Sequence, residues 1–264
     1  MGFAWRNTFL LEVKMNTTSY AYTVSYIKAI NIDKQNDKEK LFEQEKEIYK
    51  MFPDKKLLNV IFYKNDFHNL KVIMKNRDKK FIEFESLLIY PCVYNPSEIY
   101  EHIRKNKITL LPKGLNLAAK KALIPFSEEK LQLAEFIIDK EAMDFSFNEA
   151  QRQNNKFLTD LILLENTLAN IKISLRCAKY KNTPQEALAE NSYLNKNTLV
   201  NLSLQSESEI MKYISSRGYT FEDFDLFYKN KMEKFFLKYK YVFLGIEPVI
   251  YSIYKIEYSI NDRP

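Results

Sequence analysis

The chain has 264 residues with a formal net charge of +6, and 46% of its residues are hydrophobic against 28% charged. This composition is typical of a folded globular protein and excludes a disordered one. Only 4 glycines and 8 prolines are present. These are too few for the tight turns of a many-stranded sheet, so we expect an all-α fold.

Composition and motifs also exclude several kinds of site. Cys92 and Cys177 lack metal-ligand spacing, which favours two reduced thiols over a metal centre. The sequence has no phosphate-binding glycine loop and no nucleophile beside a paired base. The most apolar late stretch, residues 241–254, is interrupted by Glu247 and Pro248, and it is shorter than the about 20 residues of a membrane span. We therefore expect no catalytic site, metal or cofactor, and membrane contact only through a partner.

Apolar residues at helical spacing predict the elements of the first half of the chain. Residues 1–14 are expected to be an N-terminal extension, with Met15 as an equally plausible start. The predicted elements are a helix over 20–30, a charged helix over 33–56 that ends near Pro53, a long helix over 57–77, an apolar segment over 81–89, a helix over 96–107 and a short helix over 115–123 closed by Pro125.

The second half follows the same helical pattern. Boundaries between groups of helices are expected at residues 111–114 and 215–218. The predicted elements are a helix over 127–140, a long helical region over 144–181, a short helix that begins at 182–186, a helix after 195–197, an aromatic and basic helix over 221–243, and a last helix that begins near Glu247 and reaches Asn261.

One short phrase occurs near the middle of each long helical region. Residues 69–75 and 170–176 both read Asn, aliphatic, Lys, aliphatic, any residue, aliphatic, basic, at an offset of 101 residues. The order of long helix, short apolar segment, polar break and short helix also recurs after each copy. A repeat at this spacing predicts one helical lobe that is built more than once, and a further copy begins at Asn261.

On a helix at about 100° per residue, each phrase places its Asn in the apolar face and its basic residues on a narrow stripe. Asn69 and Asn170 are interpreted as structural pins that bond the backbone of a neighbouring helix, because an unpaired buried amide costs about 1–3 kcal/mol. The basic residues form either a partner interface or an ordinary solvated helix face. They are Lys71, Lys75, Lys172 and Arg176.

The first copy lies in a longer recognisable motif. Asn65-Asp66-Phe67-His68-Asn69-Leu70-Lys71 resembles the phrase Asp-Phe-His-Asn-Leu-Lys of the V-type ATP synthase C-subunit family, whose eukaryotic members are the d-subunits of V-ATPases. The resemblance covers roughly residues 15–260. Three further places are similar to the family, namely Ile138-Asp139-Lys140, Asn170-Ile171-Lys172 with Arg176, and residues 243–258.

Two departures from the family pattern matter. Residues 90–92 and 190–192 replace glycines that the family has after the short helix of each lobe. Those turns are therefore expected to adopt a different backbone. The family's last helix also continues past the point where this chain stops, just after Asn261, so we expect either a short protein or a truncated sequence.

The resemblance implies both a fold and a role. The fold is all-helical, with three similar lobes around a pseudo-threefold axis that form a funnel. We expect lobe 1 over 15–114, lobe 2 over 115–217 and an incomplete lobe 3 over 218–264. The implied role is that of a non-catalytic central-stalk subunit, peripheral on the cytoplasmic side of the membrane. It would link the central-shaft subunits to the proteolipid rotor ring and transmit torque for proton or sodium transport.

A second function class remains open. The chain has pI ≈ 8.9, Lys-rich helices and many tyrosines, which would also suit a helical nucleic-acid-binding or adaptor protein. Acids and bases are intermixed along the chain rather than clustered, so we expect no nucleic-acid partner. Salt-dependent binding to random DNA or RNA would favour this alternative.

Overall fold

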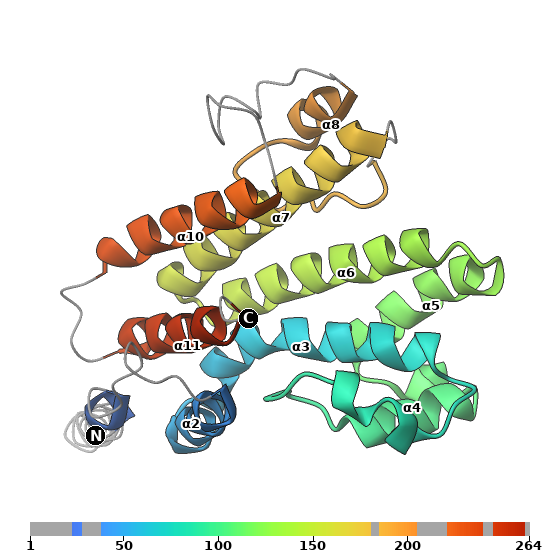
Figure 1. Cartoon of the computed structure of the whole chain (residues 1–264), viewed down its shortest axis with the longest axis horizontal. Coiled ribbons are helices and arrows are strands. Elements are labelled where there is room, and N and C mark those ends of the chain that lie inside the picture. Colours follow the sequence, from blue (N-terminus) through green and yellow to red (C-terminus); the bar gives the residue numbers. More distant parts are fainter. Residues whose placement is uncertain (1–22, 28–37, 181–184, 205–220, 240–244, 262–264) are drawn as a thin grey trace, which may run out of the picture. The chain divides into compact units, whose positions relative to one another are not determined.

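The computed structural model describes residues 23–27, 38–180, 185–204, 221–239 and 245–261 (Figure 1). Every regular element in these ranges is a helix, so the all-α prediction is confirmed. No helix within the described ranges combines the length and the apolar character needed to cross a membrane. Two predicted features, the N-terminal extension over 1–14 and the boundary at 215–218, lie outside the described residues.

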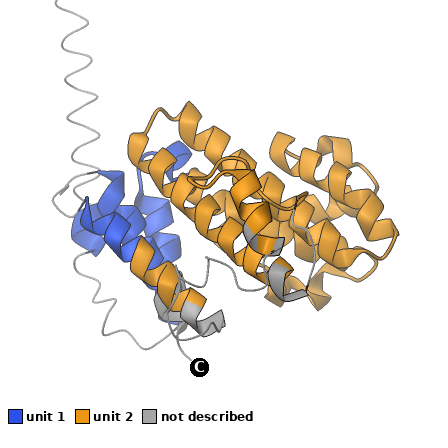
Figure 2. Cartoon of the chain, turned by 90° about the horizontal axis from the view of Figure 1, so that it is seen from above, with its two compact units in different colours: residues 1–59, 232–264 blue, residues 60–231 orange. Residues whose placement is uncertain are grey.

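The chain forms two compact units, one of residues 1–59 with 232–264 and one of residues 60–231 (Figure 2). In the first unit, α2 (Lys38–Met51) packs against α11 (Ile246–Asn261). The same unit contains the start of α3 (Lys55–Lys75) and the end of α10 (Phe221–Leu237). The α2–α11 contact is aliphatic, and its fully buried side chains include Leu41, Ile48, Val249 and Ile250.

The second unit contains most of the helices. Its elements are the rest of α3, η2 (Phe81–Glu83), η3 (Glu85–Leu87), α4 (Pro96–Arg104), η4 (Ile108–Leu110), α5 (Lys113–Ser127), α6 (Leu131–Arg152), α7 (Lys156–Tyr180), α8 (Lys196–Leu204) and the start of α10. Helix α5 packs on α6, α6 on α7, and α7 on α8.

Small residues allow α5 to lie close to α6. Ala118, Ala119 and Ala122 are fully buried along α5. Gly114 lies in the first turn of α5, where an added Cβ would come within 2.6 Å of the Phe145 ring on α6. Glycine is therefore required at this position by close approach rather than by backbone conformation.

Several predicted helices differ from the observed ones. The short helix predicted to begin at 182–186 is wrong, because residues 185–195 contain turns and bends and no helix. The predicted stop at Pro125 is wrong, because α5 continues through it to Ser127. Pro125 lies in the last turn, where the helix loses one backbone hydrogen bond and then ends two residues later, and its ring is buried. The predicted break between residues 140 and 144 is also wrong, because α6 runs to Arg152. The chain turns instead at Asn154, whose φ of 49° ends α6 in the left-handed region.

Candidate functional site

The repeated asparagines lie on α3 and α7 and are completely buried. The side-chain amide of Asn69 donates to the Ile89 carbonyl at 2.9 Å, and its Oδ1 accepts from the Ile89 N–H at 2.8 Å. Asn170 does the same with Ala189, at 2.8 Å and 3.0 Å. In each case the partner is backbone in the loop that follows the long helix, whereas a neighbouring helix was expected.

Each asparagine is the last of three polar residues that hold the same loop. In the first copy, the Asn65 side chain donates to the Pro91 carbonyl at 2.8 Å. The Asp66 carboxylate accepts from the Val93 N–H at 3.1 Å and from the Tyr94 N–H at 2.9 Å. We call Asn65, Asp66 and Asn69, with the loop backbone over 89–94, the first clamp.

The second copy repeats this arrangement, with its helix residues 101 positions and its loop residues 100 positions further along the chain. The Asn166 side chain donates to the Asn191 carbonyl at 3.0 Å and, more weakly, to the Met143 carbonyl at 3.3 Å. The Thr167 hydroxyl accepts from the Tyr193 N–H at 2.8 Å. We call Asn166, Thr167 and Asn170, with the loop backbone over 189–193, the second clamp.

The spacing of the clamp residues follows from the geometry of the two chain segments. Positions i, i+1 and i+4 share one face of a helix. On the loop side, the bonded residues alternate, at 89, 91 and 93 and again at 189, 191 and 193. The first and last residues of each trio lie about 6 Å apart along the helix and bind loop residues two positions apart, in reversed order.

The two clamps differ in the chemistry of their middle residue. Asp66 is 1% exposed, and burial raises the pKa of its carboxyl to about 7, although the N–H groups of Tyr94 and Val93 oppose this shift. Thr167 is neutral at every pH and is also buried. Both side chains supply an oxygen acceptor, so the acceptor and not the charge is common to the two clamps.

The repeat continues into the helix after each loop. The Ser97 N–H donates to Asn95 Oδ1 at 3.0 Å, which caps α4. The Thr198 N–H donates to Asn195 Oδ1 at 2.8 Å at the start of α8. Both helices have nine residues, and a side-chain oxygen on the first free N–H groups is the usual way to begin a helix.

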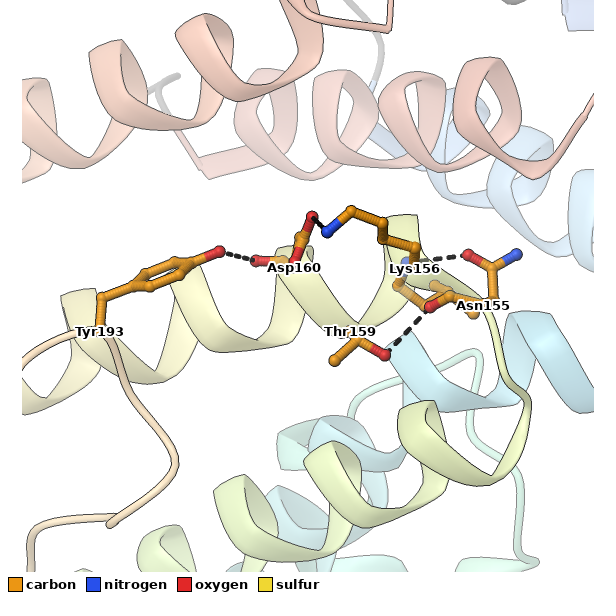
Figure 3. Close-up of polar contacts among 6 residues, drawn as sticks. Asn155, Lys156, Thr159, Asp160 and Tyr193 are labelled. Atoms are coloured by element: carbon orange, nitrogen blue, oxygen red, sulfur yellow. Dashed lines mark hydrogen bonds and ion pairs between the residues drawn. The ribbon is translucent and has the colours of Figure 1, made fainter.

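The second clamp has an additional contact at the start of α7, shown in Figure 3. The Tyr193 hydroxyl donates to the Asp160 carbonyl at 3.4 Å. The Asp160 carboxylate pairs with Lys156 at 3.0 Å, and Asn155 Oδ1 accepts from the Leu158 N–H at 3.0 Å (Figure 3). The loop is therefore fixed to α7 at two levels about two helical turns apart.

The four basic residues of the repeated phrase lie on the same two helices. Lys71 pairs with Asp139 of α6 at 2.6 Å, and Lys75 pairs with Glu135 of the same helix. On α7, Lys172 pairs with Asp225 of α10 at 3.4 Å and lies 5.4 Å from the centre of the Phe224 ring. Arg176 is exposed. Lys71, Lys75 and Lys172 thus make ion pairs between helices of the chain, and a partner interface at the four residues stays a prediction.

Sequence reasoning missed the other clamp residues, although a signal was present. The helix copies agree beyond the phrase itself, because Asn-Asp-x-x-Asn at 65–69 matches Asn-Thr-x-x-Asn at 166–170. Extending the comparison four residues upstream would have found both polar pairs. Across the described ranges, no group of three or more His, Cys, Asp or Glu residues could hold a metal ion.

Comparison with known proteins places the chain in a family. It matches the ATP synthase (C/AC39) subunit family over residues 14–260, the extent that the sequence motifs indicated. No curated protein matches it significantly. Because the family match covers nearly the whole chain, this protein belongs to the ATP synthase (C/AC39) subunit family and is a subunit of a V-type ATPase or ATP synthase.

Proposed function

We propose that this protein is the non-catalytic central-stalk subunit that links the central shaft of a V-type ATPase or ATP synthase to its proteolipid rotor ring. Its task is mechanical, since it transmits torque between ATP turnover at the shaft and ion transport at the ring. It acts on the cytoplasmic side as a peripheral subunit. The observation that carries this proposal is the family match over residues 14–260.

The clamps support a mechanical role. A part that transmits torque has to resist shear between its helices and loops. Asn170 and Thr167 hold the loop after α7 through buried hydrogen bonds, and the first clamp does the same after α3. Opening either loop would leave several buried polar groups unpaired at about 1–3 kcal/mol each, so each helix and its loop move as one body.

The proposal includes an arrangement of lobes. Helix, clamped loop and capped short helix recur from α3 to α4 and from α7 to α8, with the helix residues 101 positions apart and the loops and short helices 100 positions apart. We propose that they belong to lobe 1 (15–114) and lobe 2 (115–217), that residues 218–264 begin lobe 3, and that the lobes form a funnel. Arg176 and the exposed parts of Lys71, Lys75 and Lys172 would lie where acidic groups of a partner could reach them.

Affinity purification from detergent-solubilised membranes tests the proposal. The tagged full chain should retain both central-shaft subunits and the proteolipid ring. Vesicles that carry the complex should pump ions on addition of ATP, and removal of this chain should leave ATP hydrolysis without pumping. Retention of neither shaft nor ring would overturn the proposal.

The same preparation separates this role from nucleic-acid binding. A coupling subunit should bind random DNA or RNA no better than a neutral control protein at physiological ionic strength. Tight binding that falls steeply as salt is raised would instead support the nucleic-acid-binding alternative.

A further inference from the structure

A pocket lies between the end of α10 and the start of α11, both labelled in Figure 1, within the unit of residues 1–59 and 232–264. Its volume is about 400 Å³, which is the size range of side-chain and small-ligand sites. Two kinds of side chain dominate its lining, three aromatic rings and two carboxylates. They are Phe236, Tyr239 and Tyr251, with Glu233 and Glu247.

The rings form an apolar inner end with one accessible wall. Phe236 is 6% exposed and its ring centre is 4.9 Å from that of Tyr251, at an angle of 39°. Tyr251 is 36% exposed. The Nζ of Lys255, which does not line the pocket, lies 5.3 Å from the centre of the Tyr251 ring. This distance is within the about 6 Å of cation–π contacts, so the ring already attracts one cation.

The two carboxylates make no ion pair within the described residues. Neither Glu233 nor Glu247 makes a side-chain hydrogen bond or an ion pair with any part of the chain that the structure describes. Glu233 is exposed on α10, and Glu247 is half-buried in the first turn of α11. Some other acids of the chain are paired, since Asp139 and Glu135 each contact a lysine.

Aromatic rings beside two carboxylates favour a ligand that carries a positive charge. An apolar ligand would cover two carboxylates, which is costly, whereas a guanidinium can stack on aromatic rings and donate to both acids. We propose that this pocket binds an arginine side chain presented by a partner protein. The inference deepens the proposed function by naming the chemistry of one contact, and it rests on that function only for the identity of the partner.

Binding of an arginine probe to the full chain tests the site directly. The probe is N-acetyl-L-arginine methylamide, followed by ligand-observed NMR with saturation of the protein's aromatic protons. Its neutral isostere, N-acetyl-L-citrulline methylamide, is the matched ligand control. Saturation should transfer to the arginine δ-methylene, the citrulline probe should bind at least about tenfold more weakly, and raised salt should weaken only the arginine probe.

Variants then locate the site. The double variant E233Q/E247Q and the single variant Tyr251→Leu should each weaken arginine binding about tenfold or more, with thermal melts close to the parent. Tyr193→Leu, which removes an exposed tyrosine of the other unit, should leave binding unchanged. Equal binding of the arginine and citrulline probes, or full binding to E233Q/E247Q, would overturn the assignment. Failure of the complex to co-purify would overturn the proposed function but not this site.

Discussion

The two clamps solve one structural problem with different chemistry. In both, three polar residues on one face of a long helix bind the backbone of the following loop. The first uses the carboxylate of Asp66 where the second uses the hydroxyl of Thr167. The first loop is also partly open to water at its asparagine, since Ile89 is 39% exposed while Ala189 is fully buried.

The comparison of the two clamps shows which side-chain features both loops require and which feature occurs in one clamp alone. An oxygen acceptor at the middle position and an amide at the last position are needed, because buried N–H and C=O groups of the loop have to be paired. A titratable group is tolerated in one clamp only. The middle position of the first clamp should therefore respond to pH while that of the second should not, and exchanges between the two clamps test this.

Removing the last asparagine should have the largest effect. Asn170→Ala breaks two hydrogen bonds to Ala189 and leaves the fully buried backbone N–H and C=O of Ala189 unpaired. The free energy of unfolding should fall by about 2–4 kcal/mol. Asn69→Ala should cost less, about 1–3 kcal/mol, because water reaches Ile89. Urea unfolding followed by far-ultraviolet circular dichroism measures both losses. Equal losses would contradict the burial argument, and Asn195→Ala, an exposed cap, is the control with an expected cost of about 1 kcal/mol.

Placing a carboxylate at the middle position of the second clamp, as in the first, should also lower the free energy of unfolding. Thr167→Asp places a carboxylate at a 7% exposed site, and its desolvation should cost about 1–3 kcal/mol at pH 8 and less at pH 5, where the acid can keep its proton. Unfolding curves at the two pH values give the difference. Thr167→Ser keeps the acceptor and should cost less than about 1 kcal/mol at either pH. A Thr167→Asp cost independent of pH would show that the new carboxylate escapes to water.

Removing the titratable group from the first clamp shows how the stability of this clamp depends on pH. The folded protein holds the Asp66 proton up to a pKa of about 7, whereas the unfolded chain releases it near the ordinary value of 3.8. The folded state therefore binds more protons between these values, so the stability due to this proton is complete below 3.8 and is lost as pH rises through 7. Asp66→Asn cannot titrate and should lack this decline.

Unfolding free energies of the parent and of Asp66→Asn at matched pH values measure the effect. Their difference should change in favour of the Asn variant as pH rises, with a slope of at most about 1.4 kcal/mol per pH unit. Parallel curves across this range would mean that the carboxyl is already ionised in the folded protein at acidic pH, held so by the Val93 and Tyr94 N–H groups.

These features differ in how far the sequence predicts them. The all-α fold follows from helical spacing and few turn residues, and the repeat follows from the offset of Asn69 and Asn170. The loop partners could not be predicted, because every residue offers the same backbone N–H and C=O. The helix break at Gln153 to Asn155 was missed although Asn154 and Asn155 are residue types that end and cap helices.

The smallest expected change in stability comes from position 174, where α7 and α3 carry different residues. Ser174 on α7 is fully buried, and its hydroxyl has no hydrogen-bond partner among the described residues. The corresponding residue of α3 is Ile73, which is also fully buried and belongs to the apolar core of its unit. Replacing Ser174 with Ala removes an unpaired polar atom and improves helix propensity, so the free energy of unfolding measured in urea should rise by about 0.5–1 kcal/mol.

Ser203→Ala is the matched control. Its buried hydroxyl donates to the Val200 carbonyl at 2.7 Å, so its removal should destabilise the protein by about 1 kcal/mol. A loss at Ser174 equal to that at Ser203 would show that the Ser174 hydroxyl is bonded, by water or by the chain, and that α7 has adapted its core to a serine.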